Sequence, residues 1–169
     1  MKKILFLITA FILTAGYCSA QTGNNQISVG AEGDFFISNL NSAYGVGFGG
    51  NVKGMFGVGT AGQVTLTAGY SSFGGKSGTV FSNQTFSMIP ILAGYRQNFK
   101  GGLYLEPQAG VTINTTHFNG GTFSETEFGA GLNVGYATNG FDVSARYFSE
   151  GDVFGMFAVR VAYNFSLGK

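Results

Sequence analysis

The residues best suited to chemistry in this chain of 169 residues lie close together near position 120. His117 is the single histidine. A turn at 120–121 would bring it opposite Ser124, with Glu125 adjacent. Nucleophilic catalysis needs a base within hydrogen-bond reach of a hydroxyl and a third group that orients the base. The trio matches by residue type only. A histidine in a loop rich in Thr, Asn and Gly is usually just solvated, so we expect no catalytic residue.

A run of glycines within 45–50 invites comparison with a phosphate-binding loop. Such a loop joins a strand to a helix, and no helical pattern occurs after residue 20. We expect these glycines instead to make room inside the fold for large side chains such as Arg96 or Arg160.

Metal and cofactor sites have little support. The chain has one histidine and one cysteine, and its carboxylates lie singly along the sequence. Metal centres gather several such ligands at short spacing. We therefore expect no metal and no cofactor.

Residues 1–20 have the pattern of a secretory signal peptide. Two lysines precede an apolar run over 4–15, and small residues follow near a cleavage site. The run is shorter than the roughly 20 residues that a membrane-spanning helix needs. Cys18 could instead be a lipoprotein cysteine, but Tyr17 stands where such a site has a small residue. Cleavage after residue 20 would leave one domain, 21–169, without a disulfide.

The charge balance argues against nucleic acid as a partner. Without Lys2 and Lys3 the chain has 7 basic residues (9 minus 2) against 8 acidic ones. Nucleic-acid-binding domains carry a basic patch or stripe, which this balance does not supply.

An alternation of apolar and polar residues indicates the elements that would position any site. Over 141–148, one set of alternate residues is apolar and the other is polar or charged: Phe141, Val143, Ala145 and Tyr147 against Asp142, Ser144 and Arg146. Residues two apart share one face of a strand. A soluble barrel hides its apolar face, whereas a barrel in lipid turns that face outward.

The same alternation recurs in eight segments, and we expect strands at about 25–36, 43–56, 62–72, 86–99, 103–116, 126–137, 141–148 and 155–166. Tyr44 is placed among the outward residues. The predicted fold is all-β, an eight-stranded antiparallel up-and-down transmembrane β-barrel. Pro90 and Pro107 cannot donate to a ladder and a closed barrel has no free edge, so we expect local bulges there.

Charged residues within these strands fall on the inward face. The expected set is Glu32, Asp34, Lys53, Arg96, Glu106, Glu127, Asp142, Arg146 and Arg160. Side chains just fill the lumen of an eight-stranded barrel. We therefore predict a plugged polar core of paired charges rather than a pore.

Turn chemistry supports this register. Asn139-Gly140 is a strong two-residue hairpin signal. A three-residue turn over 100–102 would pair Phe99 with Leu103 and set Arg96 opposite Glu106.

Two longer connections, about 73–85 and 117–125, are expected on the outer side, as is usual for bacterial outer-membrane barrels. Phe81 and Phe86 flank residues 82–85 of the first, and Phe118 and Phe123 flank the turn at 119–122 of the second. Exposed aromatic edges are typical of a partner-binding surface, and the alternative is a girdle at the lipid headgroups.

With "SMIPILAGYRQNFKGGLYLEPQAGV" (Ser87–Val111) and "FAVRVAYNF" (Phe157–Phe165), the chain resembles the small outer-membrane β-barrel family of OmpX and OmpA-barrel type found in Bacteroidota. The resemblance implies an integral location in the outer membrane of a Gram-negative bacterium. It also implies insertion by the barrel-assembly machinery, which recognises alternating aromatics in the last strand. Tyr163 and Phe165 match that signal.

The leading functional hypothesis is a non-enzymatic outer-membrane barrel, surrounded by outer-membrane lipid. It would contribute to envelope integrity or, through its outer loops, to adhesion or to binding a host-surface or membrane-protein partner. One alternative is a lipid-A-modifying hydrolase that uses His117. Another is a secreted soluble barrel that binds an apolar ligand, which requires the two faces to be reversed.

Overall fold

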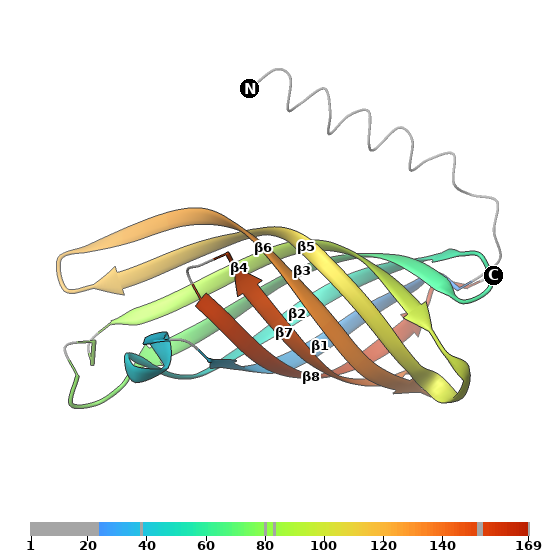
Figure 1. Cartoon of the computed structure of the whole chain (residues 1–169), viewed down its shortest axis with the longest axis horizontal. Coiled ribbons are helices and arrows are strands. Elements are labelled where there is room, and N and C mark those ends of the chain that lie inside the picture. The colour runs from blue at the N-terminus through green and yellow to red at the C-terminus, as the bar shows by residue number, and fades with distance from the viewer. Residues whose placement is uncertain (1–23, 38, 80, 83, 152–153, 169) are drawn as a thin grey trace, which may run out of the picture.

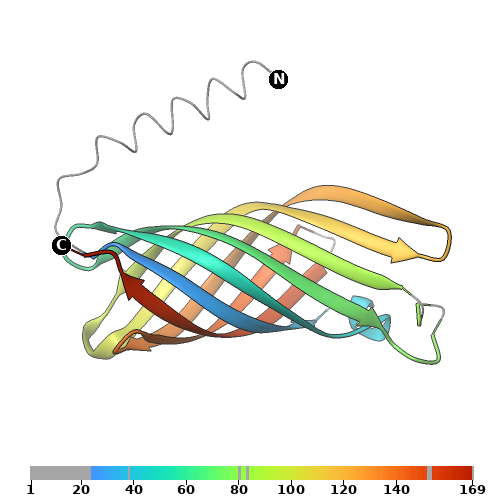
Figure 2. The same cartoon turned by 180° about the vertical axis from the view of Figure 1, so that it is seen from behind.

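Eight strands form a closed barrel in which each strand pairs antiparallel with its neighbours in the chain (Figure 1). The computed structural model describes residues 24–168 apart from 38, 80, 83, 152 and 153, so the expected signal peptide lies outside the described residues. Pairing of the first strand with the last closes the sheet (Figure 2). The strands are β1 (Gln26–Phe36), β2 (Tyr44–Val58), β3 (Gly62–Gly75), β4 (Thr85–Asn98), β5 (Leu103–Phe118), β6 (Gly121–Thr138), β7 (Phe141–Glu150) and β8 (Phe154–Ser166).

The predicted eight-stranded antiparallel up-and-down barrel is therefore confirmed. Within the described residues, no helix is long and apolar enough to cross a membrane.

One end of the barrel, here called the turn end, has short connections. The second of these contains the 3-10 helix η2 (Lys100–Gly102). Asn139 (φ 49°) and Gly140 (φ 86°) both take the left-handed conformation that a type I′ hairpin turn requires. The backbone N–H of Phe99 donates to the carbonyl of Leu103 at 2.8 Å. Both predicted turn registers are confirmed.

The opposite end, here called the loop end, differs from expectation. β1 and β2 are joined through the 3-10 helix η1 (Asn39–Ser42), and β3 and β4 through residues 76–84. The predicted long connection at 117–125 is wrong, because β5 and β6 stay paired up to a two-residue turn at 119–120. This hairpin projects beyond β7 (Figure 1). Its outer part, residues 114–127, is here called the β5–β6 extension.

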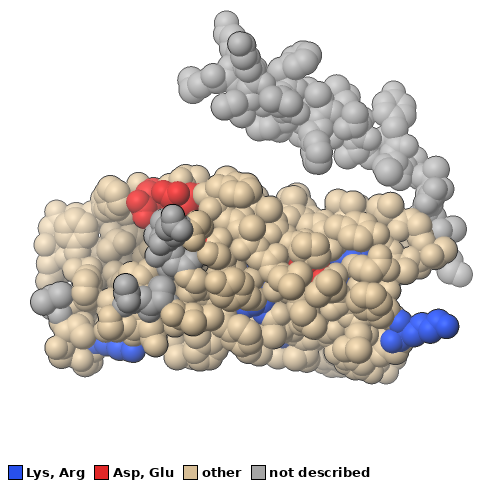
Figure 3. Space-filling model, in the orientation of Figure 1, with Lys and Arg blue, Asp and Glu red and all other residues tan. Residues whose placement is uncertain are grey.

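The two faces of the sheet separate as predicted. Large apolar side chains on the outer surface are exposed, for example Val52 at 51%, Leu66 at 56% and Val134 at 49%. Charged side chains within the barrel are buried, and Figure 3 shows few charged atoms along the wall. Tyr44 departs from its predicted outward place. It is buried at the loop end, because the register of β2 against β3 shifts between Tyr44 and Gly47.

The expected bulges at the two prolines are wrong. Next to Pro90 the β3–β4 ladder stops at Ala68↔Ile91 and resumes in the same register. Next to Pro107 the β4–β5 ladder is interrupted after Gly94 and likewise resumes without a shift. Each proline therefore removes ladder contacts locally but leaves the in/out order of its strand unchanged.

The lumen is not polar throughout. Near the loop end it is filled by an apolar cluster: Phe36, Ala43, Tyr44, Phe73, Phe86, Met88, Leu92, Phe148 and Met156. Leu40 and Phe81 pack against this cluster, and the rings of Phe36 and Phe73 lie 4.5 Å apart. The predicted core of paired charges is therefore wrong for this part of the lumen, which is filled mainly by aromatic and aliphatic side chains.

Glycines on the lumen side make room for aromatic rings. A Cβ at Gly47 would come within 2.3 Å of the Phe73 ring, and one at Gly135 within 2.4 Å of the Tyr104 ring. Real Cβ atoms do not approach a ring so closely. Each ring can therefore occupy its position only because the residue beside it is glycine. The expectation that the glycines at 45–50 admit arginines is corrected at Gly47, where the neighbour is Phe73.

Charge on the outer wall should be tolerated only beyond the apolar band. Leu132 lies at the centre of the outward apolar residues of β6, which run from Phe128 to Tyr136. Leu132→Arg should destabilise the barrel by about 2–4 kcal/mol if that centre lies at the bilayer midplane. Urea unfolding in lipid vesicles measures this, with heat-dependent migration on detergent gels as the sign of a closed barrel.

Thr122→Arg is the matched control, since Thr122 lies on the same face of β6 in the β5–β6 extension. It should change the unfolding free energy by less than about 1 kcal/mol. Equal losses for the two variants would show that the outer surface has no depth-dependent apolar band.

Candidate functional site

Apart from Glu150, the buried charged residues lie on the turn-end side of the apolar cluster. The structure brings together eight of the nine predicted residues, here called the lumen network: Glu32, Asp34, Lys53, Arg96, Glu106, Asp142, Arg146 and Arg160. They come from β1, β2, β4, β5, β7 and β8. The ninth, Glu127, is only half-buried and lies toward the loop end on β6. The network has four acids and four bases, so its formal charges cancel.

Glu106 is the best-satisfied carboxylate of the lumen network. Lys53 Nζ lies 2.7 Å from Glu106 Oε2, with the two side chains 2% and 0% exposed. Thr65 Oγ1 donates to Glu106 Oε1 at 2.7 Å, and Gln108 Nε2 donates to the same oxygen at 2.9 Å. Asn133 Nδ2 donates to Oε2 at 3.3 Å. This set of donors satisfies both oxygens of the buried carboxylate and identifies Glu106 as a structural group.

Asp142 gathers the other strong contacts. Arg96 Nη1 donates to Asp142 Oδ2 at 2.8 Å, and Tyr104 OH donates to Oδ1 at 2.7 Å. Arg160 Nη1 lies 3.6 Å from Oδ1. Arg96 also stacks on the Tyr104 ring, with its guanidinium carbon 3.5 Å from the ring centroid. Tyr104 thus contacts both members of the ion pair.

The expected Arg96–Glu106 pair is wrong, although the register that suggested it is correct. Gly94↔Gln108 and Gln97↔Leu105 place the two residues opposite each other on β4 and β5. Their side chains instead reach across the lumen, to Asp142 on β7 and Lys53 on β2. Register identifies neighbours along the wall, whereas long side chains in a narrow lumen also reach the far side.

The third group surrounds Glu32. Asn51 Nδ2 donates to Glu32 Oε2 at 2.8 Å, and Arg146 Nη2 lies 3.4 Å from the same oxygen. Arg160 Nε donates to Asn51 Oδ1 at 2.7 Å, which joins this group to that of Asp142. Asp34 is held more loosely, since Arg146 Nη2 lies 3.9 Å from its Oδ1.

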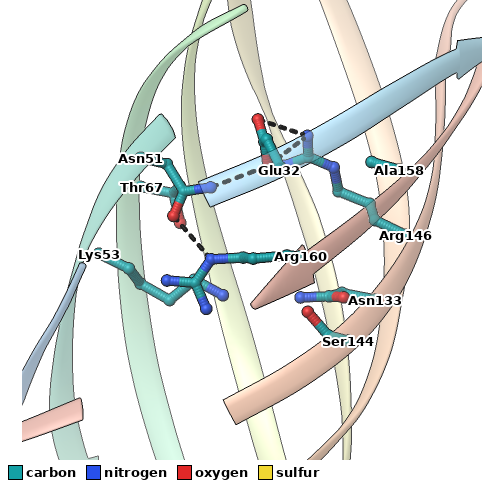
Figure 4. A pocket seen from close by; sticks show the side chains of 9 residues that line it. All are labelled: Glu32, Asn51, Lys53, Thr67, Asn133, Ser144, Arg146, Ala158 and Arg160. Atoms are coloured by element: carbon teal, nitrogen blue, oxygen red, sulfur yellow. Dashed lines mark hydrogen bonds and ion pairs between the residues drawn. The ribbon is translucent and has the colours of Figure 1, made fainter. Parts of the chain in front are cut away.

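A small cavity lies within the lumen network (Figure 4). Its volume is about 10 Å³, which is room for about one water molecule. The lining residues are Glu32, Asn51, Lys53, Thr67, Asn133, Ser144, Arg146, Ala158 and Arg160. A cavity of this size does not hold a substrate, and no group of three or more His, Cys, Asp or Glu among the described residues could hold a metal ion.

The buried residues missed in the sequence include Glu150 and Tyr104. Glu150 is 1% exposed, accepts a hydrogen bond from Asn114 Nδ2 at 2.7 Å and another from Thr112 Oγ1. It was missed because the predicted strand ended at 148, whereas β7 continues to 150. Tyr104 was missed because the alternation of β5 shows that it lies inward but does not show that its hydroxyl contacts a charged group.

The His117–Ser124 pairing is wrong. The hairpin turns at 119–120, so Thr122 lies opposite His117 and Ser124 lies opposite Thr115. His117 Nδ1 is 3.1 Å from Thr122 Oγ1, on the exposed side of the β5–β6 extension. Glu125 is three positions after Thr122 in the same strand, so its side chain faces the other side of the sheet. No catalytic trio is assembled there.

The four predicted loop aromatics separate into two pairs. Phe86 is buried in the apolar cluster of the lumen and Phe81 packs against it, so neither is an exposed contact residue. Phe118 and Phe123, in the β5–β6 extension, are exposed at 45% and 58%. Phe165 and Tyr163 point outward from β8, and their rings meet edge to face at 4.8 Å.

The second candidate site is the edge of β6 in the β5–β6 extension. The pairing of β6 with β7 runs from Thr138↔Phe141 to Ala130↔Ser149, and β7 ends at the next residue. Over Gly121–Phe128 the described strand partner of β6 is β5 alone. This edge of β6, here called the free edge, therefore has no strand partner among the described residues, and an unpaired edge can accept another strand.

No family model and no curated protein matches the sequence. The fold is similar to solved outer-membrane barrels. The attachment invasion locus protein Ail of Yersinia pestis is 16% identical, with a TM-score of 0.63, and the match covers 86% of this chain and 99% of Ail. Neisserial surface protein A is 18% identical, with a TM-score of 0.60, and the match covers 85% and 97%.

A third solved structure, the N-terminal barrel domain of Pseudomonas aeruginosa OprF, is 18% identical with a TM-score of 0.54, and the match covers 85% of this chain and 100% of that domain. At these identities the likeness shows the fold alone. The chain thus has the fold of small outer-membrane β-barrels.

The ion pairs of the lumen network can be tested by a double-mutant cycle. Glu106→Leu should destabilise the barrel by about 3–5 kcal/mol, because it leaves Lys53 charged and unpaired in the lumen. Adding Lys53→Met should restore most of that loss. Urea unfolding of the refolded barrel measures each free energy.

Arg96→Met in the Glu106→Leu background is the control. It should restore nothing and add a further loss, since it leaves Asp142 without its closest cation. Rescue by Arg96→Met rather than by Lys53→Met would mean that Glu106 pairs with Arg96 after all.

Proposed function

We propose that this chain is an integral outer-membrane protein of a Gram-negative bacterium that binds a partner protein outside the cell and catalyses no reaction. In this proposal the barrel is the anchor and the β5–β6 extension is the binding element. The observation that carries it is the free edge of β6, which the barrel holds beyond the apolar wall.

The dimensions of the apolar wall support insertion in a membrane. Its outward residues span eight residue steps on β1 (Ile27 to Phe35), on β6 (Phe128 to Tyr136) and on β8 (Phe157 to Phe165). Eight steps measure about 27 Å along a strand. With the usual tilt of 35–45°, that length gives an apolar band about 20 Å high, close to the roughly 25 Å of outer-membrane barrels.

The aromatic end of β8 supports the expected route of insertion. Tyr163 and Phe165 are exposed on its outer face. Phe141 of β7 lies beside Tyr163, with ring centroids 5.4 Å apart. In the proposal these residues contact outer-membrane lipid in the finished barrel and present the alternating aromatic signal to the barrel-assembly machinery.

Filling of the lumen argues against transport and against the soluble alternative. The apolar cluster occupies one half and the lumen network the other. The small cavity within the lumen network is lined mainly by polar and charged residues, and the faces are the reverse of those of a secreted soluble barrel. The hydrolase alternative loses its geometry, because His117 does not face Ser124.

Adhesion is the form of partner binding that the comparisons favour. The name of Ail refers to attachment and invasion, and we extend attachment to this chain as a proposal. Ail is also known in complex with sucrose octasulfate, a heparin analogue. In the described loop-end segments 37–43, 76–84 and 114–127 the basic side chains are Lys76 and the single histidine, so a polysulfated ligand is not favoured here. A contribution to envelope integrity is the second candidate.

The proposal of a plugged lumen predicts no ion conduction. The refolded protein should give no current steps of defined size in planar bilayers, because eight strands leave no water-filled path when side chains fill the interior. Well-defined steps that disappear when the lumen is altered at Gly47→Val would contradict the plugged lumen.

The role of the β5–β6 extension can be tested by shortening it. Replacing residues 115–124 with Asn-Gly would retain the Asn114↔Glu125 pair, which is a hydrogen-bonded pair of the ladder and can flank a two-residue turn. The shortened protein should fold and stay in the outer membrane but lose adhesion of expressing cells to a host-cell surface. A matched replacement of the exposed loop segment 77–79 should leave adhesion unchanged, and equal adhesion by all three proteins would overturn the proposal.

A further inference from the structure

The backbone of the free β6 edge presents hydrogen-bonding groups in a fixed order. Phe118 and Gly121 flank the two-residue turn at 119–120. Residues that flank such a turn form a hydrogen-bonded pair, and these pairs alternate along an antiparallel ladder. The residues whose N–H and C=O groups point away from β5 are therefore Thr122, Ser124, Thr126 and Phe128.

The side chains beside this edge give it a chemical character. On the inner face, Phe123, Glu125 and Glu127 follow one another at alternate positions. Phe123 and Glu125 are exposed, and Glu127 is half-buried. The ion pairs found among the described residues involve neither glutamate. In Figure 3, acidic atoms gather near the end from which the hairpin projects.

On the basis of the proposed function, we infer that the β6 edge binds an extended segment of a partner protein that carries basic residues at alternate positions. Main-chain hydrogen bonds to the edge would supply the pairing, as in other cases of strand addition. Cross-strand contacts to Glu125 and Glu127 would select lysine or arginine two residues apart. An apolar residue two positions further would lie against Phe123.

A second copy of this chain fits the edge poorly. When two β6 edges pair antiparallel, inward-facing residues oppose inward-facing residues. Glu125 would then lie opposite Glu125 or Glu127 of the other copy. Like charges directly opposite each other destabilise a strand pair, so the same two glutamates oppose self-association and favour a basic strand.

Synthetic peptides against the refolded full-length barrel in nanodiscs provide the test. One peptide has lysines at alternate positions in a Thr/Val strand sequence, a second has the same composition with the lysines adjacent, and a third has glutamates in place of the lysines. Two opposite-charge pairs change affinity by a factor of about 2 to 30. The alternating lysine peptide should bind more tightly than either other peptide by a factor in this range.

Two sets of variants distinguish the contribution of the glutamate charges from that of the main-chain hydrogen bonds of the β6 edge. Glu125→Lys with Glu127→Lys should reverse the order, so that the acidic peptide binds most tightly. Thr126→Pro removes an N–H from the free edge and keeps every charge, and proline is tolerated at such an edge. It should abolish binding of all peptides, whereas Thr126→Val should not.

The outcomes distinguish this inference from the proposed function. Equal binding of the three peptides that Thr126→Pro abolishes would overturn the basic partner and leave edge binding intact. Peptide binding that is unchanged by Thr126→Pro, or that fails altogether, would overturn strand addition at β6. Dimers of the barrel that Thr126→Pro disperses would identify a second copy as the occupant and contradict the inference.

Discussion

The width of the lumen is the constraint on which the structure depends. An eight-stranded barrel leaves an interior that side chains fill, so every second residue of every strand has to fit the same narrow space. The chain meets this constraint by placing small residues opposite large ones and acidic residues opposite basic ones. Gly47 lies under the ring of Phe73 and Gly135 under that of Tyr104, while Lys53 of β2 reaches across to Glu106 of β5.

The two halves of the lumen solve this problem with different chemistry. The apolar cluster needs only shape complementarity, whereas each charge of the lumen network needs a specific partner. A buried ion pair is often no more stabilising than well-packed apolar residues of similar volume, but an unpaired buried charge is strongly unfavourable. Because Glu32–Arg146 and Arg96–Asp142 join strands that are not neighbours, a strand out of register would separate several pairs at once.

Alternation in the sequence was enough to predict the strands, their faces and the closed barrel. It could not predict the ion-pair partners, because register defines neighbours along the wall while Arg96 and Glu106 both pair across the lumen. The β5–β6 extension was missed because its outward residues, Thr115, Thr122 and Ser124, are polar, so the apolar alternation ends there while the strands continue. The register shift between Tyr44 and Gly47 places Tyr44 in the lumen, and the spacing of residues in the sequence does not indicate this shift.

Because the strands end at different heights at the loop end, the free β6 edge lies on one side of the barrel only. β6 stands above β7 by the length of Gly121–Phe128, whereas on its other side β5 is flanked by β4 up to the Thr85↔His117 pair. A strand that pairs with β6 has to arrive over the short β7–β8 side. Rotation of the barrel about the membrane normal thus turns the side with the free β6 edge toward or away from a neighbour fixed in the same membrane. A ligand that arrives from the medium can approach this edge in any rotational state of the barrel.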